Sequence, residues 1–272
     1  ATILTALLLL MAPYTVLATD SDGDGTDDVD DDFPDNPCAD TDTDGDGLPD
    51  TVVSGCTYDS VVAYTSFEDP FAASIQYTDT GSESVSRYLW NNANQSHIAH
   101  NQTTGPEMGF TLYYTSTGSV GLTDGDWFGT VNYTGTVGNF TDGTKGYQMS
   151  DVDGIATLAL DNVTAESLSF DFFFQDTGYE ASGPMDYLVV RFIGANSDIE
   201  IINTTGFDID TDNSTWLDTW TTMTVLIGSA GTGHLEFEFS TNAGFEALYL
   251  DNIVFSSSVA MMADSDDDND GW

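Results

Sequence analysis

Aspartate dominates residues 20–50, where it fills 14 of 31 positions and Lys, Arg and Glu are absent. Carboxylates at alternate positions lie about 6 Å apart, and each such pair repels by roughly 0.7 kcal/mol even in bulk water. An ordered structure with this composition therefore requires a multivalent cation. The alternative is an acidic disordered linker, because runs of like charge are commonly solvated and extended.

The spacing of these residues favours calcium. Loops of the EF-hand type take oxygen ligands from positions that include 1, 3, 5, 9 and 12, with a glycine at position 6. The first match places Gly25 sixth and supplies the ligands Asp20, Asp22, Asp24, Asp28 and Asp31. The second starts 22 residues later and supplies Asp42, Asp44, Asp46 and Asp50. Its twelfth residue is Val53, so this loop must borrow a ligand.

A third match supplies Asp266, Asp268 and Asp270, followed by Gly271. Three occurrences of one spacing are hard to obtain from acidity alone, so we predict that the segment binds Ca²⁺. The repeats lack the Glu at position 12 and the flanking helices of a true EF-hand, and they carry Phe33-Pro34 and Asn36-Pro37.

These repeats resemble thrombospondin type 3 repeats. The resemblance implies a chain that wraps calcium ions with little hydrophobic core. It also implies a disulfide between Cys38 and Cys56, the chain's only cysteines. A bond that closes a loop of this length stabilises a fold by roughly 3 kcal/mol in the chain-entropy model.

The first 18 residues are typical of a secretory signal that lacks its Met and basic start. An apolar stretch precedes Val16-x-Ala18, which fits a cleavage site. An uncleaved anchor is the alternative, but the stretch contains Pro13 and is shorter than the roughly 20 residues of a spanning helix. We expect a secreted or surface-attached extracellular protein, truncated at both ends, with no membrane span in the mature chain.

The charge and the sequons bear on partners and compartment. Against 46 acidic residues stand three basic ones, a net charge of −43, so nucleic acid is excluded as a partner. Asn-x-Ser/Thr sequons, which fit a secreted glycoprotein, begin at Asn94, Asn101, Asn132, Asn139, Asn162, Asn203 and Asn213.

Residues 58–259 alternate apolar and polar side chains in short segments separated by Gly, Asn, Asp and Ser. In residues 234–241, Leu235, Phe237 and Phe239 face one way while Glu236 and Glu238 face the other. Residues 167–176 alternate in the same way through Leu168, Phe170, Phe172 and Phe174. We predict an all-β, two-sheet sandwich. The chain then divides into a signal (1–18), calcium repeats (19–57), the sandwich (58–259) and the start of a further repeat (260–272).

The two ends of the sandwich carry a second resemblance. Residues 64–70 read YTSFEDP, and residues 248–255 read LYLDNIVF. These segments resemble jelly-roll modules such as MAM domains, adhesin-type domains and carbohydrate-binding modules, of concanavalin-like or galactose-binding-like fold. The resemblance implies a structural calcium shared by Glu68 and Asp251. Ordinary exposed carboxylates at strand ends are the alternative.

Catalytic motifs are weak in this sequence. His97 and His100 are three apart in a segment without helical pattern, and residues three apart on a strand point to opposite faces. Nothing singles out two carboxylates as a glycosidase pair. Asp208, Asp210 and Asp212 imitate a calcium loop, but position 6 is Asn213, so we predict a hairpin.

Aromatic rings supply a better candidate chemistry, because they stack on sugar rings. Trp127 and Phe128 lie in the Gly-rich segment GDWFG and are predicted to be an exposed pair, with Trp90 next. Trp216 is a further candidate, whereas Trp220 is predicted to pack. Burial in the core is the alternative for each tryptophan.

We therefore predict a calcium-binding modular protein with a non-catalytic sandwich that binds a glycan or a cell-surface protein, next to further domains of the same polypeptide. One alternative is the accessory region of a secreted hydrolase, such as a glycosidase, peptidase or nuclease, whose catalytic domain is missing. Another is an architectural component of a surface layer.

Overall fold

The computed structural model describes residues 19–69, 77–78, 88–90, 99–102, 105–116, 127–132, 134–179, 186–243 and 246–264. The chain divides into two compact units: Ala1–Tyr58 with Val259–Trp272, and Asp59–Ser258. Within the described ranges, no helix is both long enough and apolar enough to cross a membrane.

The larger unit is built almost entirely of strands. Its first half contains β1 (Thr57–Thr65), β2 (Tyr77–Thr78), β3 (Tyr88–Trp90), β4 (Ala99–Gln102), β5 (Phe110–Ser116), β6 (Trp127–Val131), β7 (Gly146–Ser150) and β8 (Gly154–Leu160). Its second half contains β9 (Ser167–Phe174), β10 (Tyr187–Gly194), β11 (Asp198–Asn203), α1 (Ile209–Asp212), η1 (Ser214–Trp216), β12 (Thr221–Leu226), η2 (Gly228–Ala230), β13 (Gly233–Ser240) and β14 (Ala247–Ala260).

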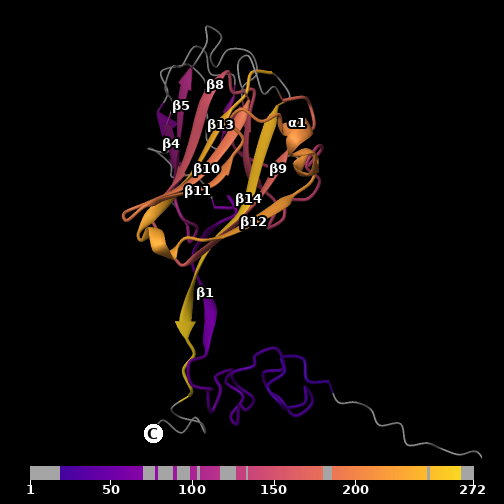
Figure 1. Cartoon of the computed structure of the whole chain (residues 1–272), viewed down its shortest axis with the longest axis vertical. Helices are drawn as coiled ribbons and strands as arrows, with labels where there is room; N and C mark the ends of the chain where they lie inside the picture. Colours follow the sequence, from indigo (N-terminus) through magenta and orange to yellow (C-terminus); the bar gives the residue numbers. More distant parts are fainter. Residues whose placement is uncertain are drawn as a thin grey trace, which may run out of the picture. The chain divides into compact units, whose positions relative to one another are not determined.

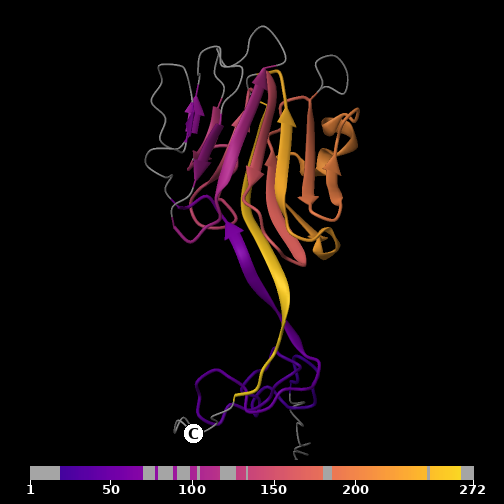
Figure 2. The same ribbon diagram turned by 90° about the vertical axis from the view of Figure 1, so that its left-hand side faces the viewer.

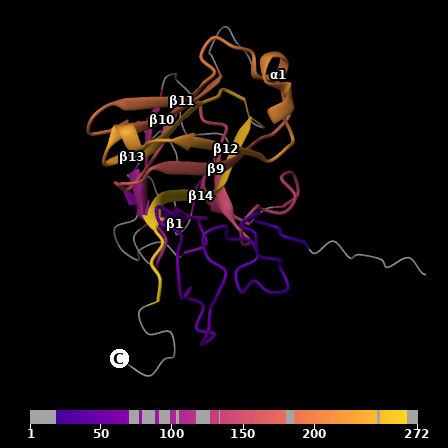
Figure 3. The same cartoon turned by 60° about the horizontal axis from the view of Figure 1, so that its bottom comes forward.

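These strands form two antiparallel sheets. Sheet A runs β12-β9-β14-β7-β6-β3, with β1 also paired to β14, and sheet B runs β11-β10-β13-β8-β5-β4-β2. The labelled strands of both sheets follow one another in these orders when the molecule is viewed from below (Figure 3). The predicted all-β, two-sheet sandwich is confirmed.

Alternation along the strands builds the core. In β13 the burial pattern alternates strictly, so that Leu235, Phe237 and Phe239 are fully buried while Glu236 and Glu238 are not. Strand β9 buries Phe170 and Phe172 on the same side, and the Phe170 ring meets the Phe237 ring edge-to-face at 5.1 Å. The core is therefore a layer of aromatic rings between the two sheets, which the sequence pattern predicted.

A second apolar cluster lies apart from this core. It contains Val131, Val137, Phe140, Phe173, Ala247 and Tyr249. Trp220 packs against it, with its ring 5.5 Å from that of Phe173, and its Nε1 donates a hydrogen bond to the Val137 carbonyl at 3.1 Å. Trp220 is thus a packing residue, as expected, although it packs on this second cluster.

The connection between β11 and β12 differs from the sequence prediction. Residues 208–213 form one turn of helix, α1, instead of a hairpin, because the Asp208 side chain caps it by accepting a hydrogen bond from Thr211 N. The segment that carries α1 and η1 lies at one flank of the sandwich, where its orange ribbon is visible in two views (Figure 1, Figure 2).

The smaller unit contains the acidic loops and very little apolar core. Among residues 19–58, Ala39 and Pro49 are the buried apolar residues, whereas Val29, Leu48 and Val53 are exposed. The predicted disulfide between Cys38 and Cys56 is confirmed, with Cα atoms 5.9 Å apart. Polar contacts therefore have to hold this unit together.

The segment after β14 belongs to the same unit. Met261 N donates to the Cys56 carbonyl at 3.0 Å, and Asp264 N donates to the Pro49 carbonyl at 2.8 Å. The Asn36 amide also contacts the Met261 sulfur at 3.5 Å. Chain segments from before and after the sandwich are thus hydrogen-bonded to each other within one unit.

Candidate functional site

The first two acidic loops have the same hydrogen-bond pattern, shifted by 22 residues. Asp20 Oδ1 accepts from Gly23 N at 2.7 Å, and Asp42 Oδ1 accepts from Gly45 N at 2.7 Å. The other oxygens of these two side chains accept from the sixth residue of their loops, at 3.2 Å from Gly25 N and 2.9 Å from Gly47 N.

The ninth position is also shared. Asp28 accepts from both the backbone and the hydroxyl of Ser21, and Asp50 accepts from both groups of Thr43. The four distances lie between 2.5 and 3.0 Å. Because the same bonds recur in both loops, the repeated sequence encodes one repeated structure.

Each loop brings three carboxylates together. Oxygens of Asp20, Asp22 and Asp24 lie within 4.8 Å of one another, as do those of Asp42, Asp44 and Asp46. Two oxygens on opposite sides of a calcium ion are about 4.6–5.2 Å apart, given Ca–O distances of roughly 2.3–2.6 Å. Both triads therefore have the size that one cation requires, and they can hold a metal ion.

The third position of each loop carries the most informative atom. Asp22 Oδ2 and Asp44 Oδ2 are both buried, and neither has a hydrogen-bond partner among the described residues. The other oxygen of each side chain is satisfied, at 3.1 Å from Asp24 N and at 3.1 Å from Asp46 N. A buried oxygen without a partner is costly, and bonding to a cation removes that cost.

Further carboxylates lie close to each triad. Burial, followed by the like charges of Asp24, Asp22 and Asp40, raises the pKa of Asp31, the predicted twelfth ligand of the first loop. Burial, with the charges of Asp46 and Asp264 contributing, likewise raises the pKa of Asp44. Converging like charges of this kind favour a divalent cation.

Asp264 is the residue that sequence reasoning missed. It lies near the second loop, which has Val53 at its twelfth position, and the loop was expected to borrow a ligand. A signal was present in the sequence: Asp264 precedes the third loop by two residues, just as Asp40 precedes the second, and Asp40 lies near the first loop.

The carboxylates of Glu68 and Asp251 accept hydrogen bonds from neighbouring parts of one loop, residues 141–145. Asp251 Oδ2 accepts from Thr141 N, Thr141 Oγ1 and Asp142 N at 2.7, 3.1 and 2.9 Å. Glu68 Oε1 accepts from the backbone N atoms of Thr144 and Lys145, both at 2.6 Å. Lys145 Nζ lies 3.3 Å from Glu68 Oε2 and thus already supplies a positive charge. A calcium ion shared by Glu68 and Asp251 stays a prediction.

The stability of the sandwich should depend on pH through Asp251. Burial raises the pKa of Asp251 from 3.8 to about 6. The folded state thus keeps this proton up to pH 6, whereas the unfolded chain loses it near pH 4, so stability falls as pH rises between these values. The expected loss is roughly 3 kcal/mol. Chemical denaturation at several pH values gives the free energy of unfolding of the protein and of Asp251→Asn as a function of pH. The difference between the two slopes measures the loss.

Calcium between Glu68 and Asp251 would reverse this result. A bound cation lowers the pKa of a carboxylate, so the stability of the unsubstituted protein would then rise with pH relative to Asp251→Asn when calcium is added. Equal slopes for both proteins, with and without calcium, would contradict the raised pKa itself.

The predicted aromatic platform needs a correction. Phe128 is fully buried: its ring lies 5.7 Å from that of Tyr114, and it stands opposite the buried Met149. The reason is that GDWFG runs into strand β6, whose alternation turns Phe128 into the core. The prediction that Phe128 is exposed and binds a ligand was therefore wrong.

Backbone pairing relates the two tryptophans of the predicted platform. Trp90 of β3 stands opposite Trp127 of β6, and Trp127 stands opposite Ser150 of β7. Predictions about the side chains of Trp90 and Trp127 lie outside the described part of the structure. So do those for residues 1–18, for His97 and for Asp266, Asp268 and Asp270.

Comparisons with known proteins match the sandwich to solved structures of low similarity. No family model and no curated protein matches the chain. The K2 cleaved adhesin domain of Lys-gingipain is 16% identical over 47% of this chain and 82% of that domain, with a TM-score of 0.32.

Two further solved structures match the chain with similarly low identities and TM-scores. The K3 adhesin domain of Lys-gingipain from Porphyromonas gingivalis is 14% identical over 73% of this chain and 100% of that domain, with a TM-score of 0.31. A family 11 carbohydrate-binding module from Clostridium thermocellum, in complex with a mixed-linked tetrasaccharide, is 12% identical over 49% of this chain and 85% of that module, with a TM-score of 0.26. Likenesses at this level do not determine what the chain binds.

Proposed function

We propose that the acidic unit binds calcium ions, one in each of its two described loops. The observation that carries this proposal is the pair of buried, unpartnered oxygens, Asp22 Oδ2 and Asp44 Oδ2, at the same position of two loops with the same hydrogen bonds. Asp20, Asp24, Asp28 and Asp31 would complete the first site. Asp42, Asp46, Asp50 and Asp264 would complete the second, with Asp264 in the place of a twelfth-position ligand.

Isothermal titration with Ca²⁺ tests the proposal. Asp22→Asn and Asp44→Asn should each reduce the number of bound ions by one relative to the unsubstituted protein, because each removes a charged ligand from a different loop. Asp35→Asn is the matched control, since Asp35 is exposed and lies outside both triads. Unchanged binding in both loop variants would refute the assignment.

The sandwich, on this proposal, is a non-catalytic binding module for a glycan or a cell-surface protein. Residues opposite each other in an antiparallel pair share a face, and neighbours along a strand alternate. The positions of Trp90, Trp127 and Ser150 therefore share the face of sheet A that Phe128 does not occupy. Gln148 Nε2 bonds Ser150 Oγ there at 3.0 Å, so polar groups accompany the aromatic positions.

A glycan array, followed by titration of any sugar that binds, tests this part. Trp127→Ala should weaken binding about tenfold, the loss expected when one stacking ring is removed. Trp220→Phe is the control, because Trp220 is held by packing and by the Val137 carbonyl. Absence of any glycan binding would remove the sugar proposal and leave a protein partner as the ligand.

An extracellular location completes the proposal. The disulfide between Cys38 and Cys56 is a bond of oxidising compartments, and calcium at the required concentrations is available outside the cell. Detection of the protein at the surface or in the medium of its host, but not inside the cell, is the expected result.

A further inference from the structure

A pocket of about 450 Å³ lies at one flank of the sandwich. Its residues come from β11, from β12 and from the segment between them that carries α1 and η1. Strand β11 is an edge strand of sheet B and β12 is an edge strand of sheet A, so the pocket is lined by one edge of each sheet. Its volume lies within the roughly 300–1,000 Å³ typical of small-molecule sites.

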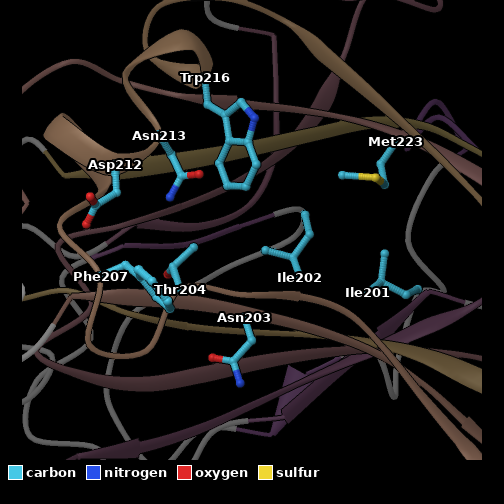
Figure 4. Close-up of a pocket in the computed structure, with 9 residues that line it drawn as sticks. All are labelled: Ile201, Ile202, Asn203, Thr204, Phe207, Asp212, Asn213, Trp216 and Met223. Atoms are coloured by element: carbon cyan, nitrogen blue, oxygen red, sulfur yellow. The ribbon is translucent and has the colours of Figure 1, made fainter.

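Trp216 forms a rigid wall of this pocket. Its ring meets that of Phe172 edge-to-face at 5.2 Å and lies parallel to that of Phe174 at 6.3 Å, so the core fixes its orientation. In the close-up, the indole points into the pocket from above (Figure 4). Trp220 donates its indole N–H to a carbonyl, whereas the Trp216 N–H has no acceptor among the described residues.

Polar groups with spare bonding capacity surround the same space. Asn203 Oδ1 accepts from Thr205 N at 3.0 Å, which leaves Nδ2 as a donor. Asp212 Oδ2 accepts from Asp208 N at 3.0 Å, which leaves Oδ1 as an acceptor. The Asn213 side chain has no hydrogen bond to any described residue, and Figure 4 shows it between Asp212 and Trp216.

A second aromatic ring completes the lining. Phe207 is 53% exposed although it is a large apolar side chain, and it lies below Asp212 in the close-up (Figure 4). Aromatic surface combined with amide and carboxylate groups matches a ligand that has an apolar face and a rim of hydroxyls. Each hydroxyl both donates and accepts, and so do the free groups of the pocket taken together.

The geometry points to this pocket as a binding site for one terminal, neutral sugar ring of a glycan. The ring would lie against Trp216 and Phe207, with its hydroxyls bonded by Asn203, Asp212 and Asn213. The sugar must be neutral because a chain of net charge −43, with a carboxylate in the pocket, repels uronic, sialic and sulfated sugars. This inference rests on the proposed glycan binding and adds a second sugar-contacting site to the face that carries Trp90 and Trp127.

The same chemistry has a second source. Asn203 and Asn213 each begin an Asn-x-Ser/Thr sequon, so a glycan attached to either side chain would bring sugar to the same space. Mass spectrometry of the protein isolated from its host separates the two sources. Unmodified Asn203 and Asn213 support the pocket as a site for free glycans, and an attached glycan on either one overturns it.

The binding test uses the whole chain produced without N-glycosylation and titrated with methyl glycosides of glucose, galactose and mannose. Binding of at least one is expected, and Phe207→Ala and Asn203→Ala should each weaken it about three- to tenfold. Phe207 is exposed, so its removal leaves the fold intact. Thr205→Ala is the matched control for Asn203→Ala, because it destroys the same sequon and keeps the amide.

The outcomes separate this inference from the function on which it rests. If a glycan binds but Phe207→Ala and Asn203→Ala bind it as the unsubstituted protein does, the pocket is refuted and glycan binding stands. Loss of binding in Trp127→Ala alone likewise refutes the pocket and keeps glycan binding. If no glycan binds at all, on the array or in titration, both fail. Tighter binding of a glucuronide than of the matching neutral glycoside overturns the neutral-sugar assignment.

Discussion

Removal of calcium by a chelator is expected to unfold residues 19–58 while residues 59–258 stay folded. The acidic unit has almost no apolar core to hold it once the cations are gone, since Ala39 and Pro49 are its buried apolar residues among residues 19–58. Metal binding then supplies the folding free energy. At calcium 100-fold above the dissociation constant, each site contributes about 2.7 kcal/mol, so two sites contribute roughly 5 kcal/mol.

Two proteases can probe the two units separately. Elastase has sites after Val29 and Val53, whereas all trypsin sites, at Arg87, Lys145 and Arg191, lie outside the acidic segment. Chelator should accelerate elastase cleavage after Val29 and Val53 and leave tryptic cleavage at Lys145 and Arg191 unchanged. Excess Mg²⁺ should not restore protection, because Mg²⁺ demands a tighter octahedral site.

Substitutions give the same experiment its controls. Asp264→Asn should raise the calcium concentration that the second loop needs for protection, because the loop loses a charged ligand, and Asp35→Asn should not. Cleavage rates that do not respond to chelator would show that the acidic unit is ordered without metal, against the proposal.

The second large effect is expected from Phe237→Ala, which should destabilise the sandwich by about 3–5 kcal/mol. Phe237 is fully buried and its ring meets that of Phe170 at 5.1 Å, so truncation leaves a cavity between the sheets. Thermal or chemical denaturation followed by near-ultraviolet circular dichroism measures the loss.

Leu226→Ala is the matched control for this truncation. Leu226 lies on β12 of the same sandwich and is 78% exposed, so its removal should change the free energy of unfolding by less than about 0.5 kcal/mol. Equal destabilisation by both substitutions would mean that the aromatic layer is not the core.

The alternation of apolar and polar residues along the strands predicted the core well. Strict alternation in residues 234–241 and 167–176 identified the inward residues Phe237 and Phe170, because one face of each strand is buried and the other is not. The acidic loops were equally readable, since their geometry depends on residues that are close in sequence and on glycines at fixed positions. The disulfide followed from a resemblance and was confirmed.

Other features depend on contacts that local sequence does not encode. GDWFG has the composition of a loop, but pairing of β6 with β7 makes it a strand and turns Phe128 inward. The Asp208 cap forms a helical turn where alternation predicted a hairpin. Asp264 comes near the second loop only because the chain returns there more than 200 residues later.

That return determines which bonds would bear tension applied between the ends of the described chain. The bonds from Met261 N to the Cys56 carbonyl and from Asp264 N to the Pro49 carbonyl join the chain before the sandwich to the chain after it. Tension applied between Thr19 and Asp264 would therefore be borne by these two hydrogen bonds. The roughly two hundred residues of the sandwich, which lie between the bonded segments in the sequence, would bear little of it. Calcium bound at the second loop would stabilise these two hydrogen bonds. Loss of the calcium would then transfer the tension to the strands of the sandwich.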